Sequence, residues 1–330
     1  MLRSLLLSSF ACTLLSVATS VLSAAGPTYT DPAKADADFA YQGEYSGTML
    51  VDGAEAKIGL QIIALGGGGF HGVGYRGGLP GDGWDKEKKI EGDGELKDGV
   101  VLFKGPDGHS AKITKDGATI IETDGGKELC QLKRVHRTSP TLGEKPPSGA
   151  VVLFDGKNGD AWDGGKVEDG LLAPAVTSKQ KFGSHKVHIE FRLPYQPEDR
   201  GQGRGNSGIY LQGRYEVQML DSFGLEAKDT ECGGIYSVKA PDVNMCLPPL
   251  AWQTYDIEYT AAKYDGDKVV SKPKVTVLHN GVVIHKDVEL PADRNTTAAP
   301  VKAGPEPGPI YLQDHGNPVR YRNIWVVENT

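Results

Sequence analysis

Short segments in which apolar and polar residues alternate recur along the chain, and long stretches with helical spacing are scarce. Alternation with a period of two residues is typical of β-strands that bury one face. The pattern predicts strands at residues 48–51, 58–64, 69–75, 100–104, 111–114, 119–122, 186–193, 207–212, 214–220, 234–236, 253–260, 274–279, 282–287, 308–313 and 319–327. The 44 glycines and 20 prolines suit the many turns between such strands. The sequence therefore predicts an all-β protein.

The first 25 residues break this pattern and are typical of a signal peptide. Arg3 supplies a positive start, Leu5–Val17 is an apolar run, and Ser23, Ala24 and Ala25 are small residues suited to cleavage. The apolar run is short for a membrane span, and no later stretch is apolar enough to replace it. We therefore expect an exported protein, periplasmic or extracellular, with no membrane insertion once the signal is removed.

The remaining chain divides at a proline-rich stretch. Residues 26–137 are interpreted as a β-rich accessory domain and residues 138–149, which hold Pro140, Pro146 and Pro147, as a linker. Residues 150–330 contain many short strands with long connections. That arrangement favours a jelly-roll sandwich of two packed antiparallel sheets.

One stretch of the second unit, residues 205–221, gathers unusual polar side chains. Two strands are expected on either side of Gly213. One face of them carries the polar side chains of Tyr210, Arg214, Glu216 and Gln218, and the other face carries apolar residues. Tyrosine, carboxylate, amide and guanidinium groups are suited to binding a polar ligand by hydrogen bonds. Antiparallel sheets also commonly expose one charged face to solvent, so a solvated surface is the alternative.

Charge and cysteine content narrow the partners and the redox chemistry. A formal net charge of −7 argues against a nucleic-acid partner. Beyond the signal segment the chain holds Cys130, Cys232 and Cys246, and an export route permits a Cys232–Cys246 disulfide or three buried thiols. The Asp155–Asp160 stretch has oxygen ligands at a spacing reminiscent of calcium loops. It lacks the distal glutamate, so a turn is favoured over Ca²⁺, and no metal or other cofactor is assigned.

The second unit resembles the 3-keto-disaccharide hydrolase domain family, whose members have a concanavalin A-like lectin/glucanase sandwich. The resemblance spans about residues 151–327. It is carried by Leu153-Phe154-Asp155-Gly156, Trp162, Glu190-Phe191-Arg192, Asn206-Ser207-Gly208-Ile209, Tyr215-Glu216-Val217-Gln218-Met219-Leu220-Asp221, Trp252, His279-Asn280-Gly281, Ile310-Tyr311-Leu312-Gln313-Asp314-His315-Gly316 and Val319-Arg320-Tyr321-Arg322-Asn323-Ile324. Each motif alone is weak, whereas their common order is specific.

Ordinary glycoside hydrolysis needs two carboxyl groups across the scissile bond. On the polar face of residues 214–220 the only carboxylate is Glu216. By alternation the side chain of Asp221 points toward the core, so it reaches the cleft only if Asp221 lies beyond the end of the strand. The resemblance implies another route, in which a ketone at C3 of a sugar acidifies the hydrogen on C2. A base removes that hydrogen, the enolate expels the C1 substituent, and water adds afterwards.

The resemblance also implies roles for particular residues. Glu216 is the expected base, with His315 and then Asp221 as alternatives. Further residues are expected to bind the carbohydrate substrate: Asn206, Gln218 and Gln313 at hydroxyls, Tyr210 by stacking or a hydrogen bond, Arg214 beside Glu216, and Arg320 and Arg322 as clamps. We therefore expect a hydrolase of 3-keto-glycosides and leave its oligomeric state open. The alternatives are a non-catalytic carbohydrate-binding module and a structural envelope protein.

Overall fold

The computed structural model of the chain describes residues 26–329 except 52, 88, 106 and 107. Across these residues the regular structure is strands and three short 3-10 helices, η1 (Pro32–Lys34), η2 (Ala37–Ala40) and η3 (Gly201–Gly203). This confirms the predicted all-β class. The proposed signal peptide, residues 1–25, lies outside the described residues. In the part that is described, no helix is long and apolar enough to cross a membrane.

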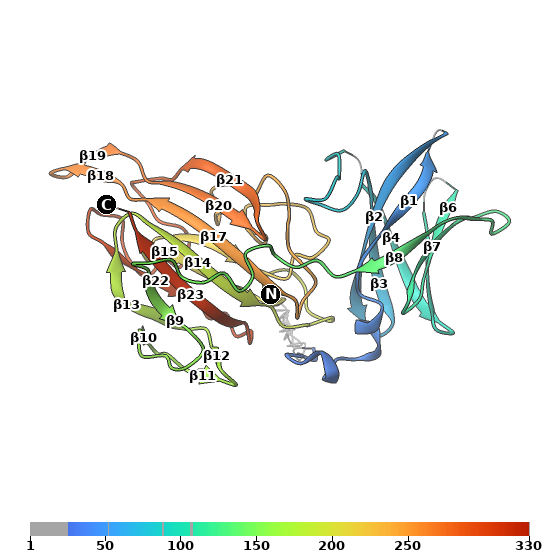
Figure 1. The fold of residues 1–330 in the computed structure, drawn as a ribbon, viewed down its shortest axis with the longest axis horizontal. Helices are drawn as coiled ribbons and strands as arrows, with labels where there is room; N and C mark the ends of the chain where they lie inside the picture. Colours follow the sequence, from blue (N-terminus) through green and yellow to red (C-terminus); the bar gives the residue numbers. More distant parts are fainter. Residues whose placement is uncertain (1–25, 52, 88, 106–107, 330) are drawn as a thin grey trace, which may run out of the picture.

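The first unit is a closed barrel, drawn at the right of Figure 1, in which each strand pairs with the next and the last returns to the first. Its interior is filled at one end by aromatic and aliphatic side chains such as Tyr45, Ile62 and Phe70, all fully buried. The strands found in the described residues are β1 (Gly43–Val51), β2 (Ala54–Gly66), β3 (Gly69–Arg76), β4 (Ile90–Lys97), β5 (Val100–Lys104), β6 (His109–Ile113), β7 (Gly117–Glu122) and β8 (Glu128–Val135).

Two strands of this barrel, β4 and β8, were not predicted from the sequence. In β4 two inward positions are Gly92 and Gly94, so the strand carries almost no apolar alternation. Its partners on both sides, β3 and β5, nevertheless hold it in the ladder. In β8 the buried positions are Cys130 and Leu132, and only these two positions mark an apolar face.

The second unit is a sandwich of two antiparallel sheets. The smaller sheet has the order β10 (Trp162–Asp163), β13 (Val176–Phe182), β22 (Gly308–Leu312), β15 (Ser207–Leu211), β16 (Tyr215–Met219). The larger has the order β11 (Val167–Glu168), β12 (Leu171–Leu172), β23 (Arg320–Glu328), β14 (His185–Arg192), β17 (Trp252–Thr260), β20 (Lys274–His279), β21 (Val282–Glu289), and β9 (Val151–Phe154) also pairs with β23. A small hairpin, β18 (Lys263–Asp265) and β19 (Lys268–Ser271), stands apart.

The sandwich core lies between these sheets, as the alternation predicts. Ile209 and Val217 of the smaller sheet and Ile257 and Tyr321 of the larger sheet are buried in one continuous cluster. The segment 234–236, predicted as a strand, instead makes isolated bridges beside β16. Cys130, Cys232 and Cys246 are all free and buried.

The barrel and the sandwich share buried surface. Ile63, Val73 and Tyr75 on the outer face of the barrel belong to the same apolar cluster as the sandwich core. In the other direction, Tyr195 of the sandwich packs into the cluster that fills the barrel, and its backbone pairs with that of Tyr29. Apolar burial on both sides fixes the two units against each other.

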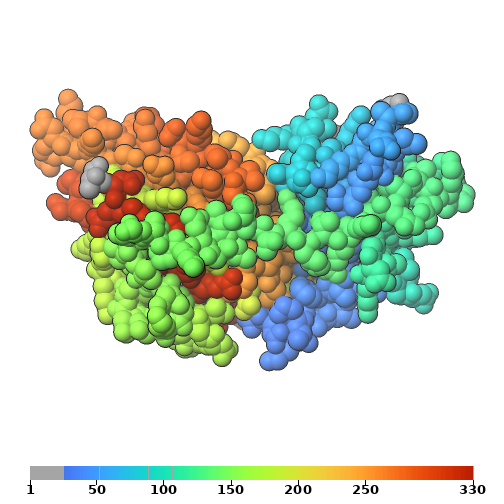
Figure 2. All heavy atoms as spheres, in the orientation of Figure 1, coloured from blue at the N-terminus to red at the C-terminus, as the bar shows by residue number. Residues whose placement is uncertain are grey.

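Residues 138–149 join the two units, and we call them the strap. The strap lies on the outer face of the larger sheet, where Figure 2 shows the green chain crossing the sandwich. The Ser139 hydroxyl hydrogen-bonds to that of Thr254 at 2.6 Å, and the backbone N–H of Gly143 donates to Glu190 at 2.6 Å. A stretch expected only as a linker therefore also covers polar groups of the sheet.

Candidate active site

The β15–β16 hairpin places a row of polar side chains on the outer face of the smaller sheet. Its register pairs Tyr210 with Glu216 and Gly208 with Gln218. The intervening residues, including Ile209 and Val217, point into the sandwich core. Every residue of the two strands is buried, because further segments of chain cover the polar face. The expected alternation is present, but the polar face is enclosed rather than solvated.

Glu216 is the carboxylate at the centre of this row. It is 2% exposed, and its Oε1 lies above Gly208, where an added Cβ would come within 2.1 Å of that oxygen. Its Oε2 accepts a hydrogen bond from the Tyr210 hydroxyl at 2.7 Å. Burial raises the pKa of Glu216 to about 7, and the Tyr210 hydrogen bond opposes that rise. A carboxyl group with this pKa can both accept and return a proton near neutral pH.

Tyr210 is held by three partners. Its hydroxyl lies 2.7 Å from Glu216 Oε2 and 2.9 Å from the carbonyl oxygen of Thr297, and it accepts from the Gln313 amide at 3.2 Å. Burial and then the charge of Glu216 raise the pKa of Tyr210, so the phenol stays protonated. Tyr210 is therefore a hydrogen-bond donor in this site.

Two amide side chains present unused acceptors. The amide nitrogens of Asn206 and Gln218 donate to Gln202 Oε1 at 3.1 and 3.0 Å. Their oxygens, Asn206 Oδ1 and Gln218 Oε1, are buried without a hydrogen-bond partner in the described structure. A buried polar atom left without a partner is costly, and a ligand hydroxyl would satisfy it. These two oxygens are suited to binding sugar hydroxyls.

Two tyrosines that the sequence interpretation missed border the site. Tyr311 pairs with Tyr210 across the β15–β22 ladder, and the two rings lie 5.3 Å apart. The backbone N–H of Tyr236 donates to the Glu216 carbonyl, and the charge of Glu216 contributes to raising the pKa of the Tyr236 phenol after burial. Both side chains are half-buried. The alternation of residues 308–313 puts Tyr311 on the same face as Gln313 and could have revealed it.

Arg214, expected on the second strand, lies in the turn just before β16 and does not hydrogen-bond to Glu216. Its guanidinium donates to the carbonyls of Lys302 and Glu306 at 2.7 and 2.9 Å and to the Gln212 side chain at 2.7 Å. The tight turn at Gln212 and Gly213, both with positive φ, directs the side chain to this loop. Arg214 therefore fixes the segment that covers the site, and burial rather than an arginine sets the pKa of Glu216.

In the part of the chain that the structure describes, neither alternative catalytic residue hydrogen-bonds to Glu216. Asp221 is buried and forms an ion pair with Arg204, with 2.6 Å between Oδ2 and Nε. Arg204 in turn reaches the carbonyl of Ala64 in the barrel. His315 is exposed in the loop that follows β22, two residues beyond Gln313. The structure gives Asp221 an ion-pair contact and places His315 at the surface.

Arg320 and Arg322, expected as clamps, belong to β23 in the larger sheet. They point to its outer face, on the opposite side of the sandwich from Glu216. Arg320 pairs with Glu168, and Arg322 pairs with Glu190 at 2.6 Å while its guanidinium lies 4.0 Å from the Trp252 ring centroid. Their shared face was predicted correctly from the alternation, but alternation does not assign a strand to one of two sheets.

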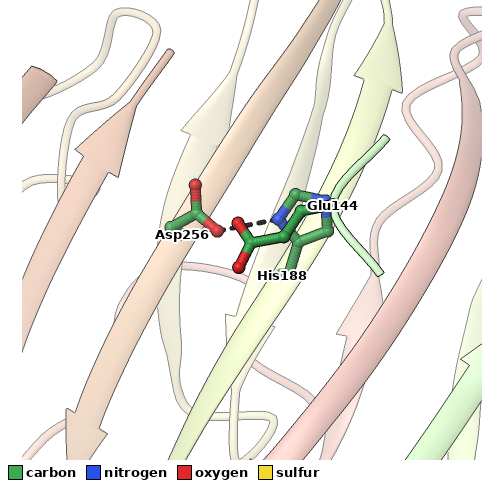
Figure 3. Close-up of side chains that lie close together, drawn as sticks. All are labelled: Glu144, His188 and Asp256. Atoms are coloured by element: carbon green, nitrogen blue, oxygen red, sulfur yellow. Dashed lines mark hydrogen bonds and ion pairs between the residues drawn. The ribbon is translucent and has the colours of Figure 1, made fainter. Parts of the chain in front are cut away.

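A second polar cluster lies under the strap on this outer face. Figure 3 shows His188 hydrogen-bonded through Nδ1 to Asp256 at 2.7 Å, with Glu144 of the strap beside them. Burial lowers the pKa of His188, but hydrogen bonds and charges from Asp256 and Glu190 outweigh burial and raise it to about 9. His188 is therefore a buried cation held between carboxylates.

The ligand atoms of Glu144, His188 and Asp256 lie within 4.8 Å of one another, a spacing that would suit a metal ion. Nδ1 of His188 is already engaged by Asp256 at 2.7 Å, and Nε2 faces Glu190 at 3.7 Å. The cluster is therefore satisfied by its own charges, and we assign it no metal. In the Asp155 loop, considered for Ca²⁺ from the sequence, the Asp155 carboxylate pairs with Lys157 at 2.7 Å.

Comparison with known families identifies the sandwich. Residues 149–327 match the model of the 3-keto-alpha-glucoside-1,2-lyase-like domain. This match covers more than half of the chain, so the protein belongs to that family, as the sequence motifs predicted.

One solved structure agrees with this assignment. A candidate glycosyl hydrolase from Parabacteroides distasonis, at 2.13 Å resolution, is 36% identical with a TM-score of 0.51, and the match covers 56% of this chain and 85% of that one. A second candidate glycosyl hydrolase from the same organism is 19% identical with a TM-score of 0.41, covering 55% and 95% of the two chains. No curated protein matches the chain.

Proposed function

We propose that the protein cleaves the glycosidic bond of 3-keto-glycosides and that Glu216 is the catalytic base. The observation that carries this proposal is a carboxyl group of pKa about 7, buried beside the two unpartnered acceptors of Asn206 and Gln218. The family name and the 36% identical candidate hydrolase support glycoside cleavage. Glu216 is the one carboxylate on the described strands β15 and β16, which favours elimination over a two-carboxylate displacement.

In the proposed first step, Glu216 takes the proton from C2 of the sugar, next to the C3 ketone. The electron pair of the broken C2–H bond is taken up in the enolate. The enolate then forms the C1–C2 double bond while the C1–O bond breaks. The departing oxygen takes the proton that Glu216 had accepted, so the alcohol leaves neutral and Glu216 is restored. Water then adds across C1–C2, with its hydroxyl on C1 and its proton on C2, and the products equal those of hydrolysis.

The surrounding side chains would each contribute one part. Tyr210 keeps its proton and supports the ionised form of Glu216 through its hydrogen bond. The oxygens of Asn206 and Gln218 would accept from sugar hydroxyls and so fix the ring. Tyr311 and Tyr236 offer half-buried aromatic rings at the border, where a sugar face can pack.

The test uses a matched pair of substrates, 4-nitrophenyl 3-keto-α-glucoside and the parent 4-nitrophenyl α-glucoside. We expect release of nitrophenol from the keto sugar alone, because only the ketone acidifies the C2 hydrogen. Replacing that hydrogen with deuterium should slow the reaction if proton removal limits it. Equal cleavage of both substrates would contradict the elimination route, and binding of the keto sugar without cleavage would favour a binding module.

We also propose that this reaction takes place outside the cytoplasm. The basis is the sequence of residues 1–25, with its positive start, apolar run and small residues near Ala25. Mass spectrometry of the protein recovered from its native host should find the mature chain beginning near residue 26. A mature protein that retains Met1 and the apolar run would contradict export.

A further inference from the structure

The barrel contains a cavity that is separate from the candidate active site. Its volume is about 430 Å³, within the range of about 300–1,000 Å³ typical of small-molecule sites. Met49, Ile58, Leu60, Phe103, Ala111 and Ile120 line it. An eight-stranded barrel is just wide enough to be filled by its own side chains or to hold one small ligand. Here one end is filled and the other is hollow.

The hollow arises from glycines at inward positions of β3 and β4. Gly72 pairs directly with Gly92, and Gly74 follows on the same inward face. These residues line the cavity where other strands contribute leucine, isoleucine or phenylalanine. Gly74 and Gly92 do not have a positive φ, so the turn geometry that usually requires glycine does not account for them. Their small size keeps the space open.

Charges at the rim indicate what kind of ligand would fit. Arg76 and Lys104 carry positive charge, whereas Asp85, Glu87 and Glu91 carry negative charge, and all five are exposed. Counting only the residues that the structure describes, such a mixed rim attracts neither an anion nor a cation strongly. The apolar wall below it gains most from a molecule that brings apolar surface and no charge.

We propose that the barrel binds a small uncharged apolar molecule in this cavity. The site is independent of the cleavage reaction proposed for the sandwich, because its lining residues all belong to the barrel and its loops. Binding would give the first unit a function of its own, as the carrier or sensor of an apolar compound.

The test is fluorescence titration of the full chain with N-phenyl-1-naphthylamine, a neutral apolar probe. Gly74→Leu should fill the cavity, because a Cβ at Gly74 meets only ordinary contacts at 3.6 Å or more. Gly92→Leu is a second filling variant, with its nearest contact at 3.4 Å. Thr48→Leu is the matched control, since Thr48 is exposed and is not among the cavity residues. The apolar run at residues 5–17 is the same in all four proteins, so any probe that binds to it contributes equally to each titration.

We expect saturable binding of one probe by the wild type and by Thr48→Leu, and affinity at least about 10-fold weaker in the filled variants. Thermal melts should show each filled variant folded. The anionic analogue 8-anilinonaphthalene-1-sulfonate should bind more weakly than the neutral probe. Equal binding by all four proteins, or no saturable binding by the wild type, would overturn the site. Tighter binding of the anionic probe would overturn the proposed neutral ligand.

Discussion

Tyr210 and Glu216 face each other directly across the β15–β16 ladder, and the tyrosine hydroxyl lies 2.7 Å from the carboxylate. The same hydroxyl lies 2.9 Å from the Thr297 carbonyl, but it has a single proton to donate. When Glu216 is ionised, the proton is directed to the carboxylate. When Glu216 is protonated, the carboxyl group can donate to Tyr210, and Tyr210 can donate to Thr297. The pair can therefore accommodate either protonation state.

Tyr210→Phe should reduce cleavage and shift its pH dependence. The change removes the hydrogen bond that opposes the burial effect, so the pKa of Glu216 should rise above its value of about 7. The pH at half-maximal kcat/KM should move upward with it, and the rate at pH 7 should fall by about 10-fold or more. An unshifted pH profile would show that Tyr210 does not tune the base.

Gly208→Ala should displace the Glu216 carboxylate. The added Cβ would come within 2.1 Å of Oε1, a distance that forces the side chain to move. We expect kcat to fall by about 100-fold, the effect of misplacing a catalytic group. Gly203→Ala is the control, because a Cβ added there would have nothing within 4 Å and Gly203 is also near the site. Equal effects of the two substitutions would contradict the positioning role of Gly208.

The Arg204–Asp221 pair should contribute to stability rather than to catalysis. Asp221→Asn leaves a buried arginine without its carboxylate, so the free energy of unfolding should fall by about 3–5 kcal/mol. The double variant Arg204→Met with Asp221→Leu should recover much of this loss in chemical denaturation. Activity per folded molecule should change little in Asp221→Asn. A large loss of kcat in a fully folded Asp221→Asn protein would return Asp221 to the catalytic candidates.

His188 should make stability depend on pH on the alkaline side. Its pKa is about 9 in the folded protein and about 6.5 when unfolded, so the folded state binds more protons between these values. The contribution is fully present below pH 6.5 and is lost as the pH rises through 9, a difference of about 3 kcal/mol. His188→Gln should flatten this part of the stability curve. Parallel curves for the two proteins would contradict a buried imidazolium.

The sequence predicted eight strands of the sandwich, β14–β17 and β20–β23, because each has one apolar and one polar face, whereas β9–β13, β18 and β19 were missed. The bounds of β20 and the positions of β14, β17 and β23 follow directly from alternation. Alternation could not show that the barrel closes, since β4 has half-buried glycines at inward positions where a pattern would need large apolar residues. It also could not show that the strap lies on the larger sheet, because those contacts join residues far apart in sequence.

The grouping of side chains at the candidate site was predicted in part for the same physical reason, while their roles in binding and catalysis stay predictions. Residues that share strands β15 and β16, or lie next to them in the sheet, were grouped correctly: Tyr210, Glu216, Gln218 and Gln313. Arg320 and Arg322 were not, because parity along a strand does not say which sheet the strand joins. Gln202 and Tyr236 come from irregular segments, and only the folded chain brings them to the hairpin.

The central claim is that Glu216 is the base that removes the C2 proton. Glu216→Gln preserves size and hydrogen bonding but removes basicity. Glu190→Gln is the matched control, a buried carboxylate on the opposite sheet. Melting curves establish that each variant is folded. Because the folded pKa of Glu216 is above its ordinary value, Glu216→Gln should be no less stable than the wild type at pH 8.

The decisive measurement is kcat/KM on 4-nitrophenyl 3-keto-α-glucoside across about pH 5–9 for these three proteins. We predict that the wild-type rate rises with pH with a midpoint near the Glu216 pKa of about 7. Glu216→Gln should lose about 10²–10⁴ of this rate and the pH-dependent rise, while folded Glu190→Gln retains both. A folded Glu216→Gln protein with the wild-type rate and pH profile would contradict the account.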